Sequence, residues 1–365
     1  MPVICYLRDL GAQGGMANLK SFTMKIYSED DICKLTNAIA SFLNTQSGLL
    51  AVNFHIDYPS TLYNNILIQS IMAQKSLEYL SLTINRWDTV FIVSTISENL
   101  KSLTRLRELS LVINDEYLEV ETTVWRKLGK SLNELNDLRR LCILLPCISE
   151  TCYGTVFREI SCERLARLES LCLNLVMVYK RGDVRPAKVF FERLKLLTGI
   201  KTLSLSLNYG CSDGIQPKVY EVFQEVWKDL GRDVKVLELR LGRMNVKSSV
   251  LPGLFENFGH VENLRVSLQK GIGVDEWKRM LEVMKKKEIG MKRLDMEIHF
   301  DKGFKDIGRV PAERLVNEIR RAVNWERLEI RGGDLCSRGN MWRVSDRNDG
   351  LLLKPNDIFV DENGV

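Results

Sequence analysis

The chain has 365 residues and a net charge of +5, from 52 basic and 47 acidic side chains. Apolar residues make up 45% and charged residues 27%, which is the balance of a soluble globular protein. The basic excess is small and dispersed, which argues against a dedicated nucleic-acid binder. No run of about 18 apolar residues occurs, so no membrane span is expected.

The N-terminus and the cysteines indicate a compartment. Met1–Asp9 has no basic start followed by a long apolar core, so secretion is not expected. The nine cysteines are odd in number and form no CxxC pair, which favours reduced thiols and a cytoplasmic or nuclear location. A mitochondrial presequence is the alternative, although Asp9 and nearby glycines interrupt an amphipathic helix at this end.

A short apolar phrase recurs along the chain. Residues 77–85 read LEYLSLTIN, residues 106–114 read LRELSLVIN, and residues 200–208 read IKTLSLSLN. Eleven copies align on one apolar anchor, about 30 residues apart: Phe22, Leu50, Leu80, Leu109, Leu141, Leu171, Leu203, Leu237, Leu264, Leu294 and Leu328. Apolar residues also stand two and four positions after each anchor, except at Gly332, and this alternation predicts strands with one buried face.

Segments with helical spacing lie between these strands. Helices are predicted over residues 31–43, 62–72, 89–103, 122–135, 186–197, 218–230, 275–284 and 311–323. Within 218–230, for example, Val219, Val222, Phe223 and Val226 fall on one helix face. Strand and helix alternate, and a single repeat cannot bury its own faces, so the repeats are expected to stack side by side.

The phrase L-x-x-L-x-L and the repeat length resemble leucine-rich repeat proteins of the ribonuclease-inhibitor-like class, over residues 18–332. The resemblance implies a right-handed α/β horseshoe solenoid of about 11 repeats. Its parallel β-sheet would be concave and its helices would lie on the convex side. The family's turn asparagine is matched only by Asn85, Asn114 and Asn208, and an apolar residue precedes that position in most copies, so longer strands are expected.

The two ends differ from the repeats. Residues 1–17 are predicted to form an N-terminal cap or an irregular strand, because the first repeat of a solenoid needs cover. An F-box ahead of the repeats is therefore not expected. Residues 333–365 are predicted to be a C-terminal tail, and a loop is predicted over 332–350 where the repeats stop. The apolar segments 351–353 and 358–360 would dock back as a cap or bind another protein.

The residues between the inward leucines should point to the concave face. The first row reads Thr23, Ala51, Ser81, Ser110, Cys142, Cys172, Ser204, Glu238, Arg265, Asp295 and Glu329. The second row reads Lys25, Asn53, Thr83, Val112, Leu144, Asn174, Ser206, Arg240, Ser267, Glu297 and Arg331. The face is therefore small and nearly uncharged up to Ser206 and carries charge from Glu238 onward.

Two interpretations of the charged rows stay open. Arg265 lies between Glu238 and Asp295, so the charges could be ion pairs between neighbouring strands. Alternatively, this end binds a protein partner and the charges set its specificity. The residues predicted for contact with a partner are Glu238, Arg240, Arg265, Asp295, Glu297, His299, Glu329 and Arg331.

No residue pattern supports catalysis or a bound cofactor. Cys142 and Cys172 should lie on adjacent strands, about 5 Å apart, but no tight cysteine pair or spaced histidine completes a zinc site. His299 with Asp295 and Glu297 has no nucleophile in register, and no phosphate-binding glycine loop occurs. No catalytic residue, metal, cofactor or small-molecule substrate is therefore expected.

The sequence thus favours a non-enzymatic scaffold or adaptor that binds a protein on its concave face, as a subunit of a larger assembly. One alternative is a regulator of an enzyme, because some proteins of this shape resemble Ran GTPase activators, although no specific motif of theirs is present. The other is a ribonucleoprotein subunit, in which Arg320, Arg321, Arg327 and Arg331 would contact nucleic acid.

Overall fold

The structure is a computed structural model, and it describes the chain in ranges. The described residues are 19–26, 32–57, 61–85, 89–114, 121–144, 150–177, 185–209, 233–241, 250–258, 260–272, 274–286, 291–300, 327–334 and 342–345. The chain divides into two compact units, Met1–Ile200 (unit 1) and Lys201–Val365 (unit 2), and each is described by itself.

Unit 1 contains a parallel sheet whose strands follow chain order. They are β1 Ser21–Ile26, β2 Ala51–Ile56, β3 Tyr79–Asn85, β4 Glu108–Asn114, β5 Arg140–Leu144 and β6 Ser170–Met177. Buried and partly exposed residues alternate along β2, β3 and β5. Leu80, Leu82 and Ile84 of β3, for instance, are fully buried while Ser81 and Thr83 are not. The apolar repeat therefore fixes which face of each strand is covered.

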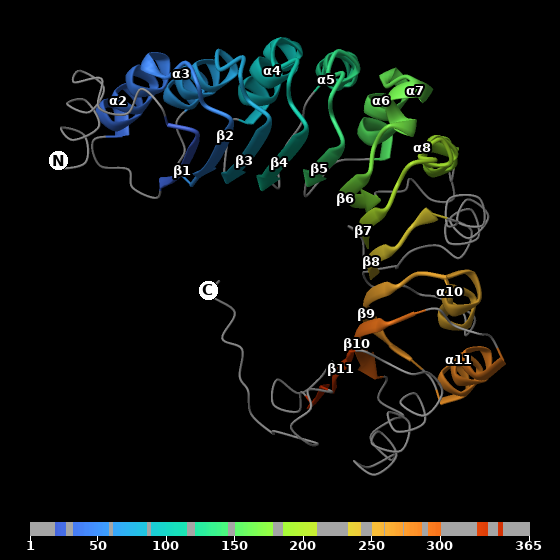
Figure 1. Cartoon of the computed structure of the whole chain (residues 1–365). Helices are drawn as coiled ribbons and strands as arrows, with labels where there is room; N and C mark the ends of the chain where they lie inside the picture. Colours follow the sequence, from blue (N-terminus) through green and yellow to red (C-terminus); the bar gives the residue numbers. More distant parts are fainter. Residues whose placement is uncertain are drawn as a thin grey trace. The chain divides into compact units, whose positions relative to one another are not determined.

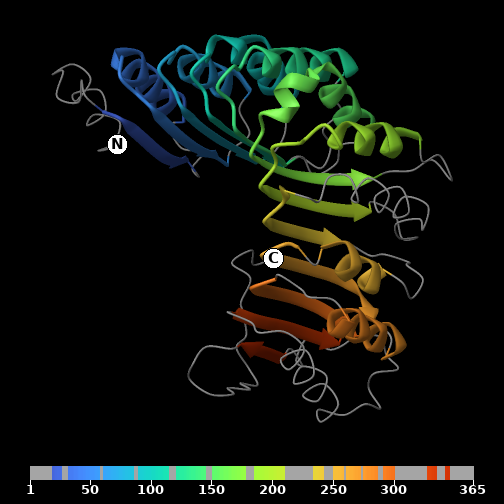
Figure 2. The same ribbon diagram turned by 45° about the vertical axis from the view of Figure 1, so that its right-hand side comes forward.

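The helices of unit 1 cover that apolar face. They are α2 Ile32–Thr45, α3 Thr61–Met72, α4 Thr89–Asn99, the 3₁₀ turn η1 Leu100–Ser102, α5 Thr122–Asn133, α6 Glu150–Glu159, α7 Cys162–Ala166 and α8 Arg185–Leu194. Figure 1 shows α2 to α6 side by side along one face of β1 to β5, and Figure 2 shows the same layer from another side. We call the opposite sheet face, in either unit, the open face.

Unit 2 repeats this arrangement. Its parallel strands are β7 Thr202–Tyr209, β8 Val236–Leu241, β9 Asn263–Ile272, β10 Arg293–Phe300 and β11 Arg327–Asp334. Its helices are α10 Val250–Phe258 and α11 Val274–Lys286. Leu237, Leu264 and Leu294 lie in one register and are buried, as in unit 1. The α/β solenoid that the sequence predicts is thereby confirmed in both units.

Apolar burial supplies most of the stabilisation of each repeat. Every described inward anchor from β2 to β10 is almost fully buried, and fully burying one such side chain contributes about 1.5–3 kcal/mol. Aromatic rings fill the larger spaces: Phe22 contacts both Phe42 and Phe54, and Phe157 packs edge-on against Phe190. The core is therefore a continuous row within each unit rather than one central cluster.

One backbone pattern recurs where seven of the described strands begin. The carbonyl of the residue before a strand accepts two N–H groups from the next repeat, as Glu78 does from Arg107 and Glu108, at 2.8 and 3.0 Å. The same double acceptance occurs at Lys20, Leu50, Arg107, Arg139, Lys201 and Glu262. These bonds hold neighbouring repeats in register without using any side chain.

The prediction for the second repeat is wrong by two residues. Val52, not Leu50, pairs with Phe22 and Leu80, so Asn53 and His55 replace Ala51 and Asn53 in the two rows. Leu50, Val52, Phe54 and Ile56 alternate without a break, so the pattern alone could not choose among them. The structure buries the last three inside the sheet and leaves Leu50 half-buried before the strand.

Other predictions have mixed outcomes. The loop predicted over 332–350 contains a strand, β12 Trp342–Ser345, which pairs antiparallel with β11. Helices α6, α7 and α10 were not predicted. Residues 1–17, the predicted helices 218–230 and 311–323, and the apolar segments 351–353 and 358–360 lie outside the described residues. The boundaries proposed for the N-terminal cap and the C-terminal tail therefore stay predictions.

Candidate interaction face

The open face of unit 1 consists of small, mostly uncharged side chains in two rows. The first row is Thr23, Asn53, Ser81, Ser110, Cys142 and Cys172, and the second is Lys25, His55, Thr83, Val112, Leu144 and Asn174. All twelve are partly or largely exposed. Asn85, at the end of β3, lies beside the second row, with its Nδ2 3.3 Å from Nε2 of His55.

Cys142 and Cys172 lie opposite each other on β5 and β6, which confirms their predicted adjacency. Both are half-exposed thiols. A hydrogen bond between them, followed by burial, raises the pKa of Cys142 above its ordinary value, while a hydrogen bond with Ser110 acts in the opposite direction. The thiol of Cys142 therefore stays protonated at neutral pH.

The open face of unit 2 holds the residues predicted to contact a partner. The first row is Ser204, Glu238, Arg265, Asp295 and Glu329, and the second is Ser206, Arg240, Ser267, Glu297 and Arg331. His299 stands in register with Gly333 of β11. Glu297, His299, Glu329 and Arg331 are placed by strand register alone. Register thus brings all eight predicted residues onto neighbouring strands.

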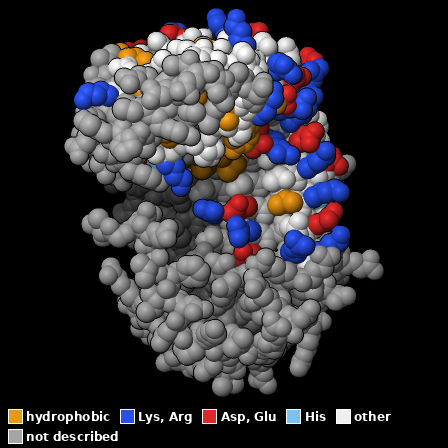
Figure 3. Space-filling view, turned by 60° about the vertical axis from the view of Figure 1, so that its left-hand side comes forward, with side chains coloured by type: hydrophobic (Ala, Val, Ile, Leu, Met, Phe, Trp, Pro, Cys, Tyr) orange, Lys and Arg blue, Asp and Glu red, His pale blue; other side chains and the backbone are white. Residues whose placement is uncertain are grey.

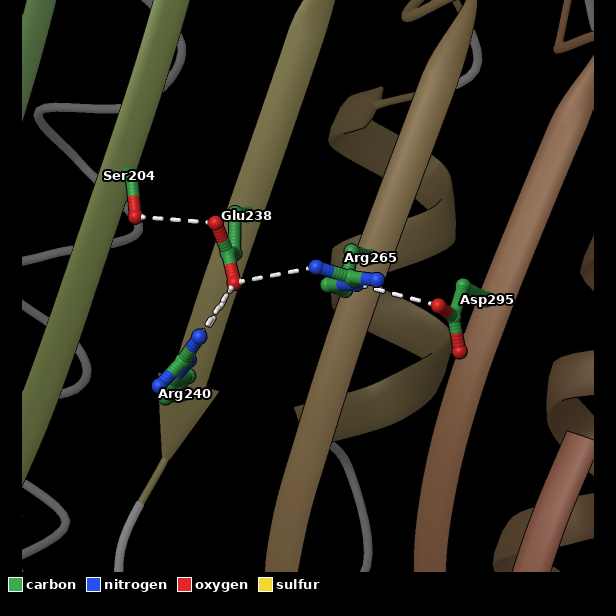
Figure 4. A network of polar contacts seen from close by, with 5 residues as sticks. All are labelled: Ser204, Glu238, Arg240, Arg265 and Asp295. Atoms are coloured by element: carbon green, nitrogen blue, oxygen red, sulfur yellow. Dashed lines mark hydrogen bonds and ion pairs between the residues drawn. The ribbon is translucent and has the colours of Figure 1, made fainter.

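Four of these residues and Ser204 form one polar network (Figure 4). Arg265 Nε donates to Asp295 Oδ2 at 3.0 Å, and its Nη1 lies 3.7 Å from Glu238 Oε1. Arg240 Nη2 donates to the same Glu238 oxygen at 2.9 Å, and Ser204 Oγ donates to Glu238 Oε2 at 3.2 Å. The predicted ion pairs between neighbouring strands are confirmed for Arg265.

The network has no net charge, but its two guanidinium groups are exposed to solvent. Two guanidinium groups face two carboxylates, and the hydrogen bond with Asp295 raises the pKa of Arg265. The side chains of Arg240 and Arg265 are 63% and 53% exposed, against 23% for Glu238 and 21% for Asp295. The carboxylates therefore position two outward-facing guanidinium groups on rigid strands, and guanidinium suits planar recognition of carboxylate or phosphate.

A second line of charge, which the sequence did not single out, precedes the strands of unit 2. Glu262 Oε2 lies 3.4 Å from Lys292 Nζ and Glu262 Oε1 lies 3.5 Å from Lys235 Nζ. A hydrogen bond and then the charge of Lys292 lower the pKa of Glu262. Aligning the residues before the strands, rather than within them, would have found this line. Figure 3 shows basic and acidic side chains interspersed over the face it views.

The histidine and acidic residues that the sequence groups together lie along one strand, β10. Asp295, four residues before His299 on β10, accepts a hydrogen bond from Arg265. Within the described ranges, no three His, Cys, Asp or Glu side chains are grouped so that they could hold a metal ion. The described helices also include none with the length and apolar character of a bilayer span.

Comparison with known proteins identifies no family. No protein-family model matches the chain, and neither does any curated protein. Among solved structures, it is similar to a Bacteroides fragilis protein from a structural-genomics programme, at 14% identity and a TM-score of 0.37, over 79% of this chain and 71% of that one. It is also similar to TLR13 in its complex with ssRNA13, at 11% identity and a TM-score of 0.33.

That second alignment covers 80% of this chain but only 48% of TLR13, so the chain spans about half the length of that protein. A sugar phosphate isomerase/epimerase from Parabacteroides distasonis aligns at 12% identity and a TM-score of 0.20, over 84% of this chain and 97% of that one. The fold is therefore assigned from the chain itself. Its recurring L-x-x-L-x-L strands, in-register parallel pairing and alternating helices make each unit an α/β solenoid of the leucine-rich repeat type.

Proposed function

We propose that this chain is a non-enzymatic scaffold that binds a protein partner on the open face of unit 2. The observation that carries the proposal is the Glu238–Arg240–Arg265–Asp295 network, in which two guanidinium groups are more than half exposed on neighbouring strands. Parallel strands hold side chains at a fixed spacing, so the ordering entropy that a partner must overcome is small.

The chemistry of the network suggests the kind of contact. Each guanidinium already has a carboxylate beside it, so its plane and direction are set before a partner arrives. Acidic side chains or backbone carbonyls of a partner are the matching groups. Glu297, His299, Glu329 and Arg331 extend the same rows on β10 and β11 and are proposed as further contacts.

We also infer that the repeats are of the ribonuclease-inhibitor-like class. A repeat of about 30 residues with an α-helix between most strands supports this assignment. Strands β3 and β4 end on Asn85 and Asn114, so the family's turn asparagine stands at the end of the strand here. Cytoplasm or nucleus is the proposed location, because a reducing compartment suits Cys142, Cys162 and Cys172 as thiols.

Charge reversal tests the proposal. The double variant R240E/R265E places four acidic groups in the network and should abolish binding of partners captured by the full chain from a cell extract. The matched control is R126E/K127E on α5, which also reverses two exposed basic residues that pair with acids, Glu159 and Glu98. Circular dichroism and thermal unfolding should first show that both variants are folded.

The decisive measurement is the affinity of each purified partner for the three proteins. Loss in R240E/R265E with retention in the control supports the open face of unit 2. Equal affinity for all three proteins shows that binding occurs elsewhere, and the proposed contact residues are then wrong.

A ribonucleoprotein subunit is a second candidate, because one observation favours it. Lys201, Lys235, Lys292 and Arg293 are exposed where the strands of unit 2 begin, with Glu262 among them. Of the arginines predicted for this role, Arg327 and Arg331 lie on β11, and Arg320 and Arg321 lie outside the described residues. Binding of a single-stranded RNA oligonucleotide should then weaken steeply with salt, and a flat salt dependence removes this candidate.

A further inference from the structure

The Cys142–Cys172 pair on the open face of unit 1 is a chemical feature that scaffold function does not use. The two residues are opposite each other in the parallel register of β5 and β6. Both are thiols, both are half-exposed, and a hydrogen bond joins them. They are thus in contact and accessible to a reagent, whereas most cysteines in proteins are buried singly.

The strand geometry lets these two sulfurs bond. Neighbouring strands are about 4.7–4.9 Å apart, and the Cα atoms of a disulfide are separated by about 4.4–6.8 Å. The register therefore places the pair at the short end of the permitted range. A disulfide there would lie partly exposed on the open face, and exposed disulfides are among the easily reduced ones.

We propose that Cys142 and Cys172 are a reversible modification site, a dithiol that closes to an intramolecular disulfide by exchange with a low-molecular-weight disulfide such as oxidised glutathione. The proposal stands independently of the partner site in unit 2. The modification would replace two thiols in the first row of this open face by one apolar S–S bridge between β5 and β6.

The exchange proceeds in two steps. The Cys172 thiolate attacks one sulfur of glutathione disulfide, a mixed disulfide forms, and one glutathione thiolate leaves. Cys142, whose raised pKa makes it the later thiol to react, then gives its proton to solvent and attacks Cys172 Sγ, displacing the second glutathione thiolate. Two protein S–H bonds and one glutathione S–S bond break. One protein S–S bond forms, and the glutathione disulfide gains the two electrons that the protein loses.

The tryptic map makes this disulfide testable on the intact 365-residue chain. Cleavage after Arg140 and Arg158 places Cys142, Cys147 and Cys152 in one peptide, 141–158, and cleavage after Arg167 and Lys180 places Cys172 in another, 168–180. The protein is titrated with oxidised glutathione, remaining thiols are alkylated, and the cross-linked peptide pair is fragmented to locate the bond. We expect a Cys142–Cys172 link, with the loss of two hydrogen atoms, that opens again in excess reduced glutathione.

Serine variants provide the controls. C142S and C172S should each abolish the link, and both should fold, because Ser81 and Ser110 hold the same row position on β3 and β4. C162S removes an exposed thiol outside the pair and should keep the wild-type yield. A bond from Cys172 to Cys147 or Cys152 overturns the proposal, as does full alkylation of Cys142 and Cys172 at the highest glutathione disulfide concentration.

Discussion

At the scale of single residues, Arg265 links charged side chains of three neighbouring strands. It lies on β9, donates to Asp295 on β10 and approaches Glu238 on β8. The distances are those of good ion pairs, but the guanidinium is 53% exposed, so water and salt screen it. Its contribution to stability is therefore small, and its value lies in orienting charge.

Replacing Arg265 by methionine should show that its ion pairs contribute little to stability. We expect the free energy of unfolding to fall by less than about 1 kcal/mol, because exposed ion pairs contribute about 0.2–1 kcal/mol. Urea denaturation at low and at high salt measures the change, and the difference from the wild type should shrink at high salt. A large loss that salt leaves unaltered would mean that the side chain acts through packing instead.

Glu262 offers a prediction about pH. Its pKa is lowered from an ordinary value of 4.5, first by the hydrogen bond with Lys292 and then by the charges of Lys292 and Lys235. A lowered folded-state pKa stabilises the fold above the unfolded-state pKa, and that stabilisation disappears as the pH falls through the folded-state value. In Lys292→Met, the Glu262 carboxyl should titrate closer to 4.5 in a carbon-13 NMR titration. Lys75→Met, at an exposed residue before β3, is the control. An unchanged Glu262 curve contradicts the assignment.

At the scale of elements, side chains that reach a neighbouring repeat's backbone bind the helical layer together. Gln74 Nε2 donates to the carbonyl of Leu43 at 2.8 Å, and Ser102 Oγ donates to that of Met72 at 3.0 Å. Asn133 both donates to the Glu159 carbonyl and accepts from the Ser161 N–H. These bonds satisfy carbonyls at helix ends, where no further turn of the helix does so.

Helices α5 and α6 are close enough that one glycine is required. A Cβ on Gly129 of α5 would lie 2.5 Å from the Val156 carbonyl oxygen and 2.8 Å from Glu159 Cβ, both on α6. Gly129→Ala should therefore destabilise the protein by about 1–3 kcal/mol, the usual cost of overpacking. Thermal and urea unfolding measure it.

Gly154 of α6 is the matched control for this substitution. A Cβ there meets nothing within 4 Å, and alanine is a better helix former than glycine by about 0.5–1 kcal/mol. Gly154→Ala should thus leave stability unchanged or raise it. If both variants lose the same stability, close helix packing is not the reason for Gly129.

The sequence predicts best those helices whose apolar residues recur at regular helical spacing. Segments 62–72, 89–103 and 122–135 were predicted as helices and are found as α3, α4 with η1, and α5. Helix α6 was missed because Gly154 interrupts it, and α10 because Pro252 and Gly253 stand in its first turn, where proline is tolerated but weakens the pattern. The charged network was predicted in outline, because register follows from the anchors, but exposure and orientation depend on packing.

At the scale of the whole molecule, the chain is built from repeats that contact their neighbours along each unit. In such proteins stability is nearly a sum over repeats and their interfaces, so damage should stay local. Hydrogen exchange on Gly129→Ala should show protection lost in α5, α6 and β5 and retained in β9 and β10. Equal loss in both units would mean that the chain unfolds as one cooperative body.

The carbonyl that accepts two N–H groups before seven of the described strands has a practical consequence for engineering. Because backbone atoms alone make these bonds, the register of the repeats does not depend on the side chains at Glu78 and Glu262, which form surface ion pairs. A protein engineer could rewrite these positions as a strip, choosing all acidic, all basic or alternating charge. The leucines that face the helices would not need to change.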